Sequence, residues 1–176
     1  MKGNGRIIIF VAILVVIVVF VLLNMTLFTI NTISVENEVY SAYIDQSGII
    51  DASGINKGRN IFFLSEKTVV SNIEKAYPYL KVINVERKFP SKVVIHVDMR
   101  QGTMSIPTSQ DGNYAIVDGE LKVLELASAD STSYSQATHV TGFAIPDPTV
   151  GTDAFAPGNE YRECLSSVSK IAVGEG

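Results

Sequence analysis

Apolar residues run without interruption near the start of the chain. Seventeen of them, Ile7 to Leu23, follow a short opening that carries Lys2 and Arg6, and the mostly apolar stretch Asn24 to Phe28 continues the run. In a helix, which rises about 1.5 Å per residue, residues 7–28 reach about 33 Å and can cross the hydrocarbon core of a bilayer. A secretory signal peptide is the alternative, but its apolar region is usually about 7–15 residues long and ends at a small-residue cleavage site. The pattern therefore predicts an uncleaved transmembrane helix over residues 7–28.

After residue 28 the apolar positions become periodic over shorter distances. Ile30, Ile33 and Val35 indicate a short strand. The range 40–54 contains a helix that Gly54 ends. Three side chains could cap the start of this helix, namely Ser41, Asp45 and Ser47, and the sequence does not decide among them.

A second helix is predicted from Ser65, which is typical of a helix cap. The apolar positions after it recur at spacings of three and four, and Pro78 ends the segment. These positions are Val69, Val70, Ile73, Ala76 and Tyr77.

Two strands follow this helix and are joined by the turn Phe89 to Lys92. The first covers residues 82–88. In the second, alternate positions are apolar, which is the period of a half-buried strand. These positions are Val93, Ile95, Val97 and Met99. The order strand, helix, helix, strand, strand predicts an α+β domain over residues 29–101, in which a mixed three-stranded sheet lies under two helices.

The remainder of the chain has a different composition. Residues 102–113 are polar, contain Gly and Pro107, and are predicted to be a connector. Residues 114–176 combine short apolar segments with long loops, at 127–138 and 144–159, and predict a second folded unit with a small core. A helix is expected at Glu160 to Ala172, with Cys164 as a small buried residue on its apolar side.

Charge gives the anchor a direction. The cytoplasmic tail, residues 1–6, carries Lys2 and Arg6, which are the predicted topology determinants, and the first cation after the apolar run is Lys57. The C-terminal part is thus expected outside the cytoplasm of a single-pass membrane protein. Residues 29–176 hold twelve basic against eighteen acidic residues, a net charge near minus six that argues against nucleic acid as a partner. Cys164 is the single cysteine, so an internal disulfide is excluded.

Candidate catalytic and metal-binding groups are sparse. His96 and Asp98 share one strand face, but without a third ligand they are typical of a solvated face. The glycines around Gly54 and Gly58 do not form a phosphate-binding motif, and the serines lack a nucleophile elbow. We therefore predict no enzyme activity, no cofactor, no metal and no small-molecule substrate.

Several short segments follow one another behind the N-terminal anchor: Ser53-Gly54-Ile55, Gly58 to Phe62, Tyr77 to Leu80, Val85 to Pro90, Tyr114 to Gly119 and His139 to Gly142. In this order they resemble the FtsQ/DivIB family of cell-division proteins. The resemblance implies that residues 29–101 are a POTRA domain and that residues 114–176 begin the family's β-rich domain. The chain reaches Gly176 where the family continues with further strands, and we expect those strands to be absent or truncated.

The resemblance also implies a function. A bitopic cell-division scaffold would recruit or stabilise septal division proteins through its exported domains and would be found in the cell membrane at the division septum. Its partners would be other bitopic division proteins with coiled-coil ectodomains and the septal wall synthase complex. The alternative is an anchored POTRA-type factor for envelope assembly or secretion that binds extended polypeptide.

The predicted topology leaves the first strand of the hairpin at the edge of the sheet. Such an edge can accept an extended segment of a partner, although charged residues on it can also prevent nonspecific pairing. The candidate partner-binding residues are Val82, Asn84, Val85, Glu86, Arg87 and Lys88.

Overall fold

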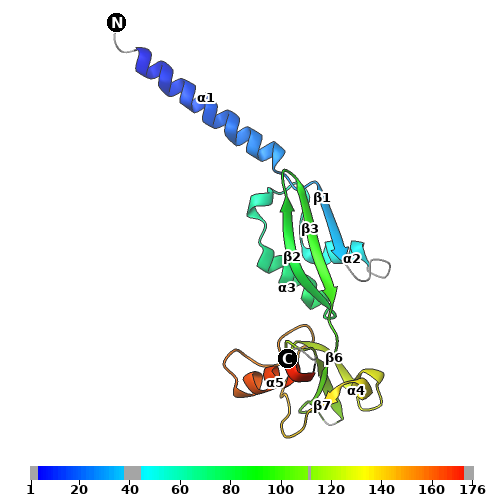
Figure 1. The fold of residues 1–176 in the computed structure, drawn as a ribbon. Helices are drawn as coiled ribbons and strands as arrows, with labels where there is room; N and C mark the ends of the chain where they lie inside the picture. The colour runs from blue at the N-terminus through cyan, green and yellow to red at the C-terminus, as the bar shows by residue number, and fades with distance from the viewer. Residues whose placement is uncertain (1–3, 38–44, 111, 173–176) are drawn as a thin grey trace.

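The structure, a computed structural model, describes residues 4–37, 45–110 and 112–172. It opens with the helix α1 (Asn4–Leu27) (Figure 1). In this helix the side chains of residues 7–22 are all exposed. Among the described residues, no helix has both the length and the apolar character that crossing a membrane requires. The transmembrane helix predicted over residues 7–28 is thus not confirmed. Lys2 lies outside the described residues, and Arg6 lies in the first turns of α1.

The first sheet contains the strands β1 (Thr32–Asn37), β2 (Leu80–Lys88) and β3 (Lys92–Met99). The strands lie in the order β1-β3-β2, with β1 parallel and β2 antiparallel to β3. The predicted mixed sheet and its element order are confirmed.

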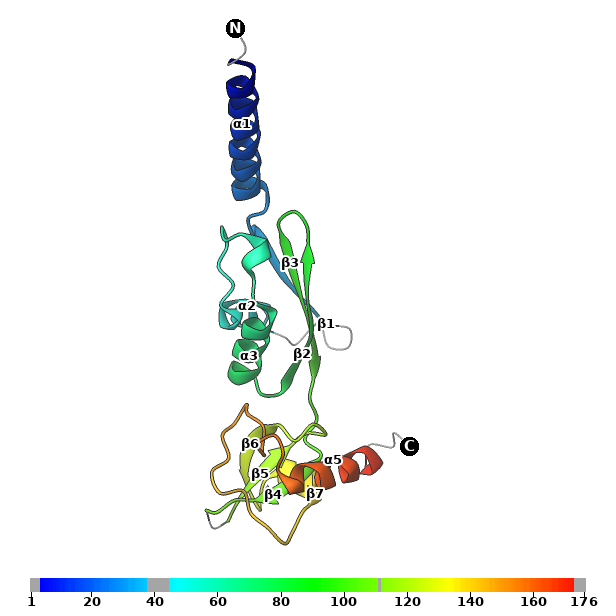
Figure 2. The same ribbon diagram turned by 90° about the vertical axis from the view of Figure 1, so that its left-hand side faces the viewer.

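Two helices cover one face of this sheet, as Figure 2 shows: α2 (Gln46–Ser53) and α3 (Glu66–Ala76), with the short 3-10 helix η1 (Ile61–Phe63) between them. Asp45 caps α2, because its carboxylate accepts the Gly48 N–H at 3.0 Å. Gly54 ends α2 with φ of 69°, a left-handed conformation that favours glycine. Of the other two cap candidates, Ser47 lies inside α2 and Ser41 lies outside the described residues.

The core under α3 has the predicted register. Val93, Ile95 and Val97 of β3 are buried together with Val69 and Ile73 of α3. Two positions of β3 depart from the alternation. Met99, expected in the core, is 41% exposed because it is the last residue of the strand, and Val94 on the opposite face is fully buried.

A second sheet follows, in the order β6-β5-β4-β7. Its strands are β4 (Met104–Pro107), β5 (Asn113–Val117), β6 (Val123–Ser128) and β7 (Thr138–His139). The short helix α4 (Thr132–Gln136) lies between β6 and β7. The range 102–113 was predicted to be a connector only, but it contains β4, because Met104, Ser105 and Ile106 are buried between β5 and β7.

The helix α5 (Glu160–Ala172) has the predicted bounds. Leu165 enters the core of the second sheet, whereas Cys164 is exposed. The prediction of a buried Cys164 is wrong because its neighbour Leu165, rather than Cys164 itself, faces the sheet.

Candidate partner-binding edge

The strand β2 is an edge of the first sheet. Within the described part of the chain it pairs with β3 on one side and with no strand on the other. Val82 and Val85 are buried under α3, while Ile83 and Asn84 are exposed. All the candidate residues named from the sequence thus lie on one edge strand, with their side chains divided between the core and solvent.

A bulge interrupts this edge. Val82 pairs with Val97 and Asn84 pairs with His96, so Ile83 is an extra residue, and its side chain is 57% exposed. The Val82 N–H points away from β3 and donates to Oε1 of Glu74 at 3.1 Å. An added strand therefore cannot use the Val82 N–H, and the part of the edge open to a partner begins after it.

The charged end of β2 makes contacts of its own. Arg87 donates to the Leu64 carbonyl at 2.7 Å and so ties β2 to the loop after η1. Glu86 lies 3.3 Å from Nε2 of His96 and 3.4 Å from Nζ of Lys88, and the hydrogen bond with His96 holds the pKa of Glu86 below its ordinary value. These contacts fit both a recognition surface and a guard against nonspecific edge pairing.

His96 lies between the carboxylates of Glu36 and Glu86. Its Nδ1 lies 3.9 Å from Glu36, on the opposite side of the ring from Glu86, and no group of three potential ligands is found among the residues that the structure describes. Asp98 is exposed and its carboxylate accepts the N–H of Met99.

A buried charge cluster connects the domain of the first sheet to that of the second. Arg100, whose side chain is 5% exposed, donates to Glu74 of α3 at 3.0 Å, to Asp118 after β5, and to Glu120 at 2.9 Å. Lys122 pairs with the second oxygen of Glu74. Because the same Glu74 also holds the Val82 N–H, this junction is linked directly to the β2 edge.

The pKa values at the junction follow from these contacts. Burial favours neutral Glu74, but the hydrogen bonds from Lys122 and Arg100 outweigh it and lower the pKa of Glu74. Burial likewise opposes the charge of Arg100, and its carboxylate partners raise its pKa. Close by, burial and the carboxylate of Glu125 on β6 raise the pKa of Tyr79 to about 12. Glu74 and Arg100 are thus held in their charged forms at neutral pH.

A glycine allows close packing at the same junction. Gly151, in the second unit, has φ of 81°, and a Cβ there would lie 3.1 Å from the Glu74 carbonyl oxygen and the Cα of Lys75. A side chain would push the loop away from α3. No local pattern in the sequence indicates this junction. In the sequence, Arg100 is simply a charged residue that follows a strand, and its partners Glu74 and Asp118 are distant from it.

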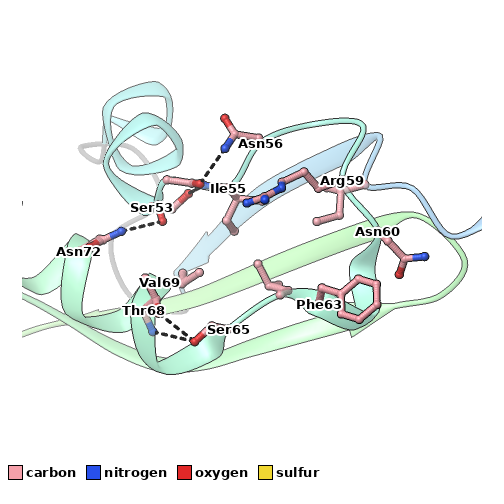
Figure 3. Close-up of a pocket in the computed structure, with 13 residues that line it drawn as sticks. Ser53, Ile55, Asn56, Arg59, Asn60, Phe63, Ser65, Thr68, Val69 and Asn72 are labelled. Atoms are coloured by element: carbon pink, nitrogen blue, oxygen red, sulfur yellow. Dashed lines mark hydrogen bonds between the residues drawn. The ribbon is translucent and has the colours of Figure 1, made fainter. Parts of the chain in front are cut away.

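A cavity of about 470 Å³ lies between the end of α2, the segment around η1 and the start of α3 (Figure 3). Asn72 donates to the Ser53 carbonyl across it at 3.3 Å, and Ser65 caps α3 at its rim. Three of its lining side chains, Ser53, Asn60 and Ser65, accept backbone N–H groups at the ends of these helices.

Comparison with known proteins shows which proteins this chain is similar to. The family model for the FtsQ-type POTRA domain matches residues 28–98, which contain α2, α3 and all of the first sheet except Met99, the last residue of β3. Two cell division proteins DivIB are each 30% identical to this chain. The protein from Clostridium tetani aligns over 128 residues, 73% of this chain and 46% of the relative, and that from Clostridium acetobutylicum over 152 residues, 86% of this chain and 57% of the relative. Residues 28–98 thus match an FtsQ-type POTRA domain, and the chain is similar to cell division proteins of the FtsQ/DivIB family.

A third relative, DivIB from Clostridium botulinum, is 28% identical over 124 residues, 70% of this chain and 46% of the relative. The chain thus spans about half the length of the curated DivIB proteins that it matches. The FtsQ/DivIB resemblance found in the sequence is confirmed, and the POTRA match begins one residue after α1 ends.

Proposed function

We propose that this protein is a membrane-anchored scaffold of cell division, which recruits or stabilises septal division proteins through its exported domains. The observation that carries the proposal is the FtsQ-type POTRA match together with relatives named as cell division proteins. Partners are expected among other bitopic division proteins with coiled-coil ectodomains and the septal wall synthase complex.

Anchoring is part of the proposal. Seventeen consecutive apolar residues precede the POTRA domain, and the side chains of α1 over residues 7–22 are all exposed in this chain. With Lys2 and Arg6 in the cytoplasm, the POTRA domain would lie outside and close to the membrane. Confinement to a surface raises the effective concentration of other anchored proteins, so weak contacts can suffice for recruitment.

The docking surface that we propose is the β2 edge from Asn84 to Lys88. A partner segment would add to the sheet as a further strand and pair with backbone groups that β3 does not use. Ile83, exposed in the bulge, would contribute an apolar contact next to the charged end of the edge. The Glu74 contact at Val82 would set the limit of the added strand.

Proline scanning of a fluorescent full-length fusion tests this function and its docking surface. The native fusion should gather at midcell, whereas Asn84→Pro should stay spread over the membrane, because proline removes a backbone donor. Asn84→Ala, which changes the side chain and keeps the N–H, should localise normally.

Consecutive N–H groups of a strand point to opposite edges, so Val85→Pro, with Val85→Ala as its control, covers the neighbouring register. Thermal unfolding identifies which of the two proline variants keeps the hydrogen bonds between β2 and β3. That variant should melt at the same temperature as its alanine control, whereas the other should melt lower. Normal midcell recruitment of that folded variant would rule out strand addition at β2. A native fusion distributed evenly around the envelope would favour the envelope-assembly alternative.

A further inference from the structure

An aromatic patch lies at the end of the first sheet nearest α1. It consists of Phe28, directly after α1, Phe62 in η1 and Phe89 in the turn between β2 and β3. The ring centroids of Phe28 and Phe62 are 5.1 Å apart, those of Phe62 and Phe89 5.2 Å, and those of Phe28 and Phe89 6.2 Å. Three segments that are distant in the sequence therefore supply one cluster.

The patch faces outward. Phe62 is 53% exposed and Phe89 is 55% exposed, although the large apolar side chains of the adjacent core are buried. Phe63, beside Phe62, is 88% exposed. Single exposed apolar residues are common on protein surfaces, but contiguous exposed ones are not. A group of exposed aromatic rings therefore marks a contact surface.

Backbone hydrogen bonds fix the patch relative to the end of α1. The Ile61 N–H donates to the Phe28 carbonyl at 2.8 Å, and the Asn31 N–H donates to the Ser91 carbonyl at 2.8 Å. The segment that leaves α1 is thus bonded to η1 on one side and to the β2–β3 turn on the other. Figures 1 and 2 both show this turn at the end of the sheet where α1 enters.

The charge around the patch is opposite to that of the rest of the exported part. Residues 57–63 and 88–92 carry Lys57, Arg59, Lys88 and Lys92 and contain no Asp or Glu, while residues 29–176 have a net charge near minus six. Lys88 also lies 3.4 Å from Glu86. Aromatic rings with basic neighbours are the composition found where proteins meet the headgroups of an anionic bilayer.

We propose that the aromatic patch is a lipid-binding seat, which rests in the headgroup region of the bilayer that holds α1. This inference depends on the proposed anchoring of α1. The bilayer is the occupant because the patch begins at the residue after the apolar helix, and because the segments that carry Phe62 and Phe89 contain four cations and no acidic residue. Seating would stop the POTRA domain from rotating about its junction with α1 and would hold the β2 edge at a fixed height above the membrane.

Tryptophan fluorescence tests the seat directly, since the chain has no native Trp. The full-length Phe62→Trp variant is reconstituted into phosphatidylcholine and phosphatidylglycerol vesicles, with or without bromine on the lipid acyl chains. The introduced indole should emit at shorter wavelength than in water and lose most of its intensity to the brominated lipid. Tyr161→Trp, which replaces a 44% exposed ring on α5, is the matched control and should not be quenched.

Each outcome has a defined meaning. Neutralising Lys57 and Arg59 with glutamine in the Phe62→Trp background should reduce the quenching in these vesicles. A vesicle-bound Phe62→Trp chain whose indole emits as in water and is not quenched overturns the seat and leaves the anchor intact. A blue-shifted but unquenched indole means that protein covers the patch, for example a second copy, and also overturns it. A chain that does not float with the vesicles overturns both the anchor and the seat.

Discussion

Replacing Arg100 by methionine should lower the free energy of unfolding by about 3–5 kcal/mol, because it leaves buried carboxylates without their partner. Glu74 and Asp118 both bind Arg100 and both are largely buried, so neither can recover its lost contact from water. Chemical denaturation of the purified chain in detergent, followed by far-UV circular dichroism, measures the change.

Arg162→Met is the matched control. The Arg162 side chain is 31% exposed, pairs with Asp153 at 3.0 Å and donates to the Phe155 carbonyl at 2.7 Å, so its loss should cost less than about 2 kcal/mol. Equal effects of the two substitutions would show that the junction is not a buried charge cluster.

Acid adds an independent check on the junction. Because the folded state lowers the pKa of Glu74, its contribution is complete above the ordinary value of 4.5 and is lost as the pH falls through the lowered pKa. Glu74→Gln should therefore flatten the loss of stability in this acidic range.

Replacing Ile95 by aspartate should unfold the POTRA domain. Ile95 is fully buried against α3, and an unpaired carboxylate there should cost more than about 4 kcal/mol, most of the stability of a small domain. Thermal unfolding of the purified chain measures the loss.

His96→Ala, one position along the same strand, should change the free energy of unfolding by less than about 1 kcal/mol, since its ring lies on the partly exposed face. If His96→Ala proved the more damaging substitution, the register of β3 would be wrong by one residue.

The features that the sequence predicted correctly depend on local periodicity and capping. Ser65 and Gly54 mark helix ends through contacts within a few residues, and the alternation from Val93 to Val97 follows from one buried face. These elements, together with short sequence segments in the same order, indicated the resemblance to the FtsQ/DivIB family that the comparisons support. The bounds of α5 were likewise set by its own amphipathic pattern.

The features that the sequence did not reveal depend on tertiary contacts. Arg100 meets Glu74 and Asp118 only after two sheets have formed, and the aromatic patch combines three separated segments. The bulge at Ile83 is a matter of pairing with β3, which no local pattern encodes. For the candidate edge, the sequence therefore indicated the strand but not the Glu74 contact that limits its open part.

Depletion of the chain from growing cells, with a fluorescent septal wall synthase as the reporter, tests the scaffold most directly. If the chain recruits septal proteins, the synthase should fail to concentrate at midcell and the cells should elongate without dividing until the native chain is restored. A synthase that still assembles at midcell, in depleted cells that divide normally, would contradict the proposed function.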